Sequence, residues 1–149
     1  MTRRLNISSG TAWESAVGYS RAVRAGNVVV VAGTTAVDET GKVVGAGDLH
    51  AQTRFVLQKI GRALREAGAS FSDVVSTRSF VTDISRWEEF GRAHAEIFRE
   101  IRPTCTLVEV KGLVRPDMLV EIEVMAVVEG CEGSAAGRTQ ERNGWSSEV

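Results

Sequence analysis

The sequence predicts an α+β domain in which a mixed β-sheet carries both of its helices on one face. Three observations lead to this fold class. Short β-branched or alternating runs, typical of strands, occupy residues 28–31, 74–82 and 102–128. Apolar side chains recur at helical spacing over residues 48–68 and 85–98. Along the chain the order is strands, helix, strand, helix and two final strands, which is the order of an α+β layer.

Length and composition fit one globular domain. The chain has 149 residues, a net charge of −1 and two cysteines, too few for a disulfide framework or a zinc site. Neither a signal peptide nor a membrane-spanning run is visible, and no basic excess suggests nucleic acid. We therefore expect a cytoplasmic protein that binds neither nucleic acid nor membrane. Composition divides it into a flexible arm (1–16), the domain (17–129) and a polar, disordered tail (130–149).

The first half of the domain contains a buried strand, a hairpin and a helix. Four consecutive valines at residues 28–31 indicate the buried strand. The run 38–42 has the composition of a turn and predicts a short return strand after it. Asp48 is placed to cap the first long helix, which ends at Gly68.

The second helix begins at a predicted capping box formed by residues 85–88 and ends before Pro103. Its apolar stripe includes His94. A lone histidine in such a stripe is more often a hydrogen-bonded edge residue than a catalyst, but it also fits a pocket wall.

Residues 102–128 are the most informative stretch, because they read as two strands joined by a short turn with carboxylates among apolar residues. Alternation places a valine-rich side toward the helices. We expect the opposite, uncovered face to collect Cys105, Glu109, Glu121 and Glu123. A large, half-apolar face of this kind usually marks an interface, so oligomerisation is expected.

This stretch resembles the C-terminal signature of the RidA family, the reactive intermediate deaminases also called the YjgF family. The family has Val-Glu-Val, a short turn and Val-Glu-Ile-Glu at this point. Similar residues recur upstream, at 18–20, 26–33 and 80–83. The resemblance spans residues 17–128, which is most of the chain.

The resemblance implies a chorismate-mutase-like fold and a homotrimer with a central β-barrel and three pockets between subunits. It implies a cofactor-independent, metal-free deaminase that hydrolyses enamines or imines of small metabolites. Glu121 matches the residue that orients the attacking water; the alternative is a structural ion pair across the trimer, with Arg78 or Lys111 as partner. Tyr19 and Gly33 match positions that close the pocket and meet the ligand, although Tyr19 also fits subunit packing and Gly33 a bulge or strand end.

One departure affects the expected substrate. The family's deaminases have an arginine that grips the substrate carboxylate where this chain has Cys105. A thiol cannot replace that bidentate cationic fork, so a substrate other than the usual 2-imino acids is expected. Cys105 and Leu107 then line the pocket. Arg78 either substitutes for the missing arginine or forms a salt bridge with one of the nearby carboxylates.

Two alternatives to the deaminase stay open. A ligand-binding or regulatory trimer would retain the fold without the reaction, which the missing arginine favours. A thiol-dependent or redox-sensitive role would instead use Cys105 directly.

Overall fold

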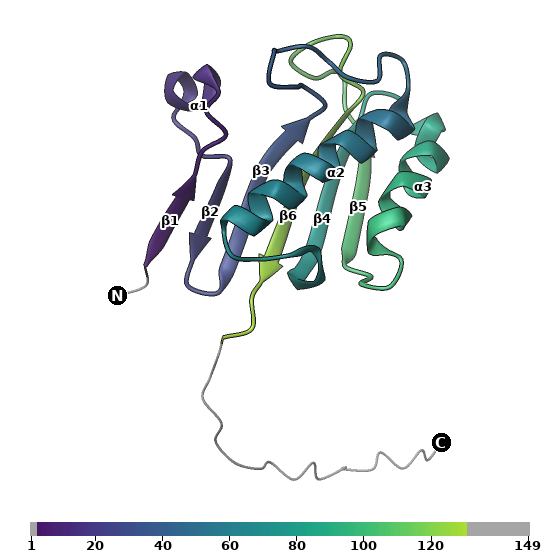
Figure 1. Ribbon diagram of the computed structural model, residues 1–149. Coiled ribbons are helices and arrows are strands. Elements are labelled where there is room, and N and C mark those ends of the chain that lie inside the picture. Colours follow the sequence, from purple (N-terminus) through teal and green to yellow (C-terminus); the bar gives the residue numbers. More distant parts are fainter. Residues whose placement is uncertain (1–2, 131–149) are drawn as a thin grey trace, which may run out of the picture.

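The computed structural model describes residues 3–130, which form a six-stranded mixed sheet with the strand order β1-β2-β3-β6-β4-β5 (Figure 1). β4 and β5 run parallel, whereas the other neighbouring strands pair antiparallel. The strands are β1 (Arg4–Ile7), β2 (Ala22–Ala25), β3 (Val28–Thr35), β4 (Val74–Val81), β5 (Thr104–Glu109) and β6 (Val120–Val127).

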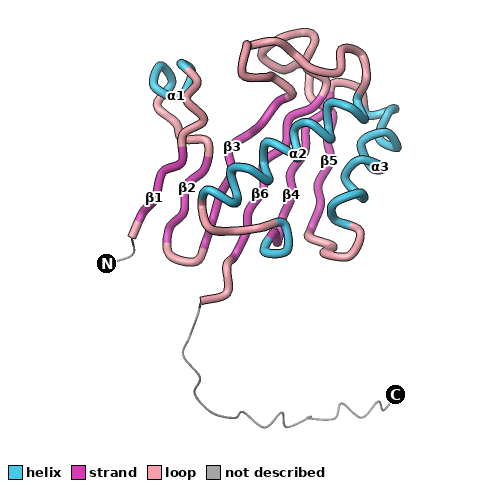
Figure 2. The backbone as a smooth tube through the Cα atoms, in the orientation of Figure 1, coloured by secondary structure: helices cyan, strands magenta, loops and turns pink. Residues whose placement is uncertain are grey.

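Two long helices, α2 (Leu49–Glu66) and α3 (Trp87–Phe98), cover one face of the sheet, and Figure 2 shows both of them on the same side. A short helix, α1 (Ala12–Val17), links β1 to β2. The predicted α+β class, with both long helices on one face, is confirmed. Among residues 3–130, no helix combines the length and the apolar character that crossing a membrane requires.

The core lies between the sheet and the two long helices. β6 shows the underlying alternation, because Val120, Ile122 and Val124 are buried whereas the residues between them are not. Each large aliphatic side chain buried here contributes about 1.5–3 kcal/mol. From the helix side, the most completely buried large apolar residues are Leu49, Val56, Leu57, Ile60 and Leu64 of α2.

The start of α2 matches the prediction, but the start of α3 does not. Asp48 accepts a hydrogen bond from the Ala51 amide at 2.9 Å, as expected of an N-cap. The capping box predicted at residues 85–88 does not form. Asp83 accepts bonds from the amide and hydroxyl of Ser85 at 3.0 and 2.6 Å, and this starts a 3₁₀ turn (Ile84–Arg86) ahead of the helix.

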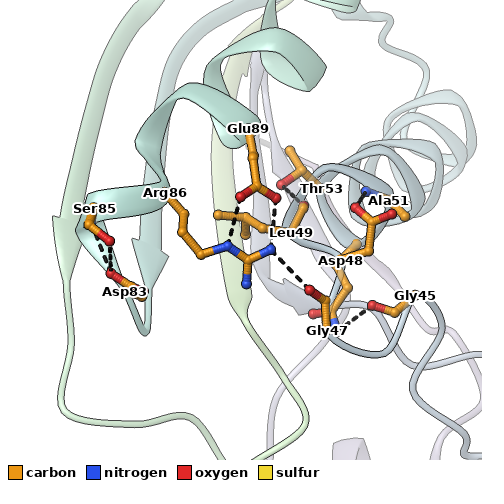
Figure 3. A network of polar contacts seen from close by, with 11 residues as sticks. Gly45, Gly47, Asp48, Leu49, Ala51, Thr53, Asp83, Ser85, Arg86 and Glu89 are labelled. Carbon is orange, nitrogen blue, oxygen red and sulfur yellow. Dashed lines mark hydrogen bonds and ion pairs between the residues drawn. The ribbon is translucent and has the colours of Figure 1, made fainter.

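Arg86 connects this turn to the loop that precedes α2 (Figure 3). Its guanidinium bonds Glu89 through Nε and Nη2, both at 2.7 Å, and its Nη2 also donates to the Gly47 carbonyl at 3.0 Å. The beginning of α3 is thereby tied to the loop that leads into α2.

The N-terminal segment is not a loose arm, so the prediction for residues 1–16 is wrong where the structure describes them. β1 pairs with β2 along its whole length. The Glu14 carboxylate of α1 then accepts a hydrogen bond from the Ser9 amide at 2.9 Å. β1 is only four residues long, and its single polar–apolar alternation was too short to identify a strand from the sequence. Of the predicted tail, residues 131–149 lie outside the described residues.

The final two strands are not joined by a short turn. β4 lies between β5 and β6, and the connection runs over residues 110–119. Gln52 of α2 holds this connection: its Nε2 donates to the Asp117 carbonyl at 2.9 Å, and its Oε1 accepts from the Leu119 amide at 2.8 Å.

Candidate functional site

Glu121 lies near the beginning of the central strand β6, on the sheet face that the helices leave uncovered. In the strand register it is opposite Thr35 of β3 and Phe80 of β4. Because Val120 and Ile122 point into the core, alternation directs the Glu121 side chain to the other face. The side chain is partly buried by its neighbours rather than fully exposed.

Gly33 makes room for this carboxylate. The pairing of β3 with β6 shifts between Val31 and Thr34, so Gly33 sits at an irregularity in the ladder. A Cβ atom added at Gly33 would lie 3.0 Å from Cδ of Glu121 and closer still to a carboxylate oxygen. The glycine therefore allows the Glu121 carboxylate to lie directly against the backbone of β3.

Burial raises the pKa of the Glu121 carboxyl above its ordinary value. The positive charge of Arg21 acts in the opposite direction, and the nearby Glu123 carboxylate adds to the increase in pKa. Within residues 3–130, Glu121 has no cationic partner within 4 Å, whereas Arg78 Nη1 bonds Glu123 Oε1 at 2.8 Å. Arg78 therefore forms the salt bridge that was one of its two expected roles.

Arg21 is a site residue that the sequence analysis missed. Its Nη1 donates to the Gly33 carbonyl at 2.9 Å and to Thr34 Oγ1 at 2.7 Å. Its guanidinium carbon lies 5.6 Å from the centre of the Tyr19 ring. The available signal was its position beside Tyr19 at the entry to a strand, but its contacts depend on the irregularity at Gly33.

Tyr19 also borders a shallow hollow on the uncovered face. This hollow of about 310 Å³ lies where α1 joins β2. Its wall is formed by Arg4, Asn6, Gly18, Tyr19, Ser20, Val23, Val30 and Ala32. The structure thus brings Tyr19, Gly33 and Glu121 together through Arg21.

Cys105 and Leu107 lie on the opposite side of the sheet, so the expectation that Cys105 and Glu109 share a face with Glu121 is wrong. The parallel register pairs Cys105 with Thr77 and Leu107 with Ser79, and both partners are buried on the helix-covered side. Leu107 packs against the core, whereas Cys105 is exposed on the edge strand. The register of β5 follows from β4, a neighbour that the sequence pattern did not identify.

Glu109 and His94 belong to this helix-covered side as well. The Glu109 carboxylate accepts a bond from the Ile84 amide at 2.9 Å. His94 Nε2 lies 3.0 Å from the Thr77 hydroxyl, and burial lowers the pKa of the imidazole. Its ring stacks against Phe98 with a 4.6 Å separation of centroids. In one chain, His94 is therefore a hydrogen-bonded residue on the far side of the sheet from Glu121.

Lys59 supports the site from the helix side and was also missed. Its Nζ donates to the carbonyls of Thr35 and Val37 at 2.9 and 2.7 Å. Burial, together with the positive charges of Arg21 and Arg62, lowers its pKa to about 8. For metals, residues 3–130 gather no group of three or more His, Cys, Asp or Glu side chains placed to hold an ion.

Comparison with known proteins gives consistent matches. The family model described as Endoribonuclease L-PSP matches residues 9–128. The 3-aminoacrylate deaminase RutC of Acinetobacter baylyi is 42% identical over 110 residues, covering 74% of this chain and 86% of that protein. An uncharacterized protein of Streptomyces coelicolor is 38% identical over 120 residues, covering 80% of this chain and 89% of that protein.

Among solved structures, the crystal structure of a YjgF/YER057c/UK114 family member from Mycobacterium tuberculosis matches with a TM-score of 0.77 at 53% sequence identity. The match covers 85% of this chain and all of that one.

Proposed function

The chain belongs to the Endoribonuclease L-PSP family, also known as YjgF or RidA, and we propose that it is a cofactor-independent deaminase of enamines or imines. Glu121 carries the proposal. It is a partly buried carboxylate with a raised pKa, and a glycine leaves space beside it. A partly buried carboxyl group of this kind can both accept and return a proton.

In the proposed reaction, an enamine first tautomerises to its imine, and water then attacks the electrophilic imine carbon. Glu121 orients the water and takes one proton as the carbon–oxygen bond forms. It passes that proton to the nitrogen, which gives a carbinolamine. Glu121 then takes the hydroxyl proton and transfers it to the amine as the carbon–nitrogen bond breaks and the carbonyl forms. The imine and one water thus become a carbonyl compound and ammonia, with no change in oxidation state.

We further propose that the pocket forms between subunits of a homotrimer. Within one chain, Glu121 and the pair Cys105 and Leu107 lie on opposite faces of the sheet. One chain therefore cannot bring these positions into a single pocket. A neighbouring copy would place its own Cys105 edge, with His94 behind it, against the Glu121 face of the first chain.

The substrate class follows from Cys105. This side chain has no cationic fork to grip a carboxylate in the way expected of a 2-imino acid deaminase. We infer a small enamine or imine whose polar groups are held elsewhere in the pocket. The relative named 3-aminoacrylate deaminase makes enamine acids the first compounds to test.

The test is an ammonia-release assay on 3-aminoacrylate, 2-iminopropionate and 2-iminobutanoate, each generated in situ. We expect acceleration of at least one enamine or imine, abolished in Glu121→Gln. Glu123→Gln is the matched control, because it removes a carboxylate two residues along the same strand and face. Equal activity in wild type and Glu121→Gln would contradict the assigned role of Glu121.

A second candidate function is a non-catalytic trimer that binds a small ligand, which Cys105 at the expected arginine position favours. Cys105→Arg separates the two readings. Activity toward 2-imino acids gained in this variant would show that the catalytic apparatus is intact and serves another substrate. Inactivity of both proteins on every compound would favour the binding role. A thiol role predicts instead that alkylating the exposed Cys105 abolishes function.

A further inference from the structure

Arg21 is a partly buried cation that forms no ion pair with the part of the chain that the structure describes. Among residues 3–130, no carboxylate lies within 4 Å of it, and its closest partners are the neutral Gly33 carbonyl and Thr34 hydroxyl. Of two other arginines on this face, Arg78 is paired with Glu123 at 2.8 Å, and Arg4 donates its Nε hydrogen to the Asn6 side chain at 2.9 Å. An uncompensated guanidinium in a partly dry site attracts an anion.

Within residues 3–130, the Nε and Nη2 edge of this guanidinium is free to bind a carboxylate. Nη1 carries two hydrogens, and its bonds to Gly33 and Thr34 use both of them. The opposite edge, formed by Nε–H and Nη2–H, has one contact among the described residues, a long bond of 3.4 Å from Nη2 to the Tyr19 hydroxyl. Two parallel N–H groups of this kind bind both oxygens of a carboxylate.

Arg21 and Glu121 share one residue between them. Arg21 binds the carbonyl of Gly33, and the Glu121 carboxylate lies over the position where a Gly33 side chain would be. Tyr19 and Ala32, which both contact Arg21, line the open hollow beside them. A metabolite of a few carbon atoms could therefore touch both charged groups at once.

We propose that Arg21 binds the carboxylate of the substrate through its Nε and Nη2 edge, and thereby takes over the task that Cys105 cannot perform. This assignment rests on the proposed function and narrows its substrate class to enamine or imine acids. Tyr19 then donates its hydroxyl hydrogen to the same carboxylate. Arg21 is a specificity residue, and Glu121 acts on the water.

The test measures the binding of stable oxo acids, which resemble the products, by NMR titration of the assembled protein. The probes are 2-oxobutanoate, acetoacetate and their neutral methyl esters. We expect at least one acid to bind wild type more tightly than its ester. Arg21→Gln, which retains an N–H donor for the Gly33 carbonyl, should weaken that acid at least tenfold, or about 1.4 kcal/mol. Arg21→Lys retains the charge without the bidentate fork, so its affinity for the acid should lie between those of wild type and Arg21→Gln.

Arg78→Gln is the matched control, because it removes an arginine from the same face, and its affinity should stay within about twofold of wild type. The proposal is overturned if Arg21→Gln binds the acid as wild type does, if acids and esters bind alike, if wild type binds neither acid, or if Arg78→Gln causes the loss.

Turnover distinguishes this inference from the proposed function. Carboxylate binding that needs Arg21, in a protein with no deaminase activity, would leave the inference standing and remove the function. Turnover of an enamine acid with an unchanged KM in Arg21→Gln would support the proposed function and contradict the role of Arg21. Circular dichroism and light scattering confirm that each variant is folded and assembled.

Discussion

At the scale of single residues, the site depends on how closely Glu121 and Gly33 approach each other. The carboxylate lies against the β3 backbone in a space that any larger side chain would occupy. Burial there raises its pKa, and the nearby Arg21 charge limits the increase. The space at Gly33 thus determines where the Glu121 carboxylate lies, and burial together with the charge of Arg21 determines its pKa.

Replacing Gly33 with alanine should separate activity from stability. The new methyl group would lie 3.0 Å from Cδ of Glu121, and the flexible carboxylate would rotate away. We expect deaminase activity to fall at least tenfold while the free energy of unfolding changes by about 1 kcal/mol or less. Gly91→Ala is the control, because a Cβ there meets nothing within 4 Å. Full activity in Gly33→Ala, measured beside its denaturation curve, would refute the close-approach role.

The raised pKa of Glu121 also predicts how stability depends on pH. A folded state with a pKa above the ordinary 4.5 binds this proton more tightly than the unfolded chain does, so ionisation at neutral pH costs stability. Glu121→Gln should therefore have a higher Tm than wild type at pH 7. This gain in Tm should shrink as the pH falls and vanish below 4.5, where Glu121 is protonated in both the folded and the unfolded state. A constant gain across a pH series of melting curves would show that charge is not its cause.

At the scale of secondary structure, α2 positions both strands that carry the site. Lys59 binds the carbonyls of Thr35 and Val37, where β3 extends beyond its pairing with β2. Seven residues earlier on the helix, Gln52 holds the segment that leads into β6. One rigid helix thus fixes the backbone on either side of Glu121.

Gln52→Leu should destabilise the protein by about 2–3 kcal/mol, because it leaves the partly buried Leu119 amide and Asp117 carbonyl without these partners. Gln58→Leu, on the exposed side of the same helix, should change stability by less than about 0.5 kcal/mol. Urea denaturation followed by circular dichroism gives both values. Equal effects would mean that helix propensity, and not the hydrogen bonds, accounts for the loss.

At the scale of the whole molecule, the uncovered face of the sheet is the surface proposed for assembly. Val30 and Met125 lie opposite each other on neighbouring strands and are 46% and 43% exposed, and Val108 of β5 is 42% exposed. Apolar side chains gathered on a sheet face favour burial against another copy.

Met125→Glu should therefore break the proposed trimer, because it would place an unpaired charge in the apolar part of the interface. We expect the mass from size exclusion with light scattering to fall from three chains to one. Val114→Glu, in the exposed connection after β5, is the control and should leave the mass unchanged. A Met125→Glu protein that keeps the wild-type mass would place the interface elsewhere.

The sequence contained enough to predict the elements and part of the site. Asp48 and Gly68 marked the ends of the first long helix, and alternation around Glu121 gave its face. The face of Cys105 was wrong because it depends on β4 lying between β5 and β6, a pairing over long sequence separation that no local pattern encodes. Arg21 was missed because its contacts arise from the register shift at Gly33.

The central place of β6 has a consequence for biosynthesis. It is the last strand among residues 3–130, yet it joins β3 on one side to β4 on the other. Until the ribosome releases it, the nascent chain holds two separate pieces of sheet with unpaired edges and an open core. Completion of the fold is thus a late, non-local event, and such intermediates are prone to aggregate. The strand that carries Glu121 is also the one that closes the domain, so a chain truncated before it would lose both the fold and the site.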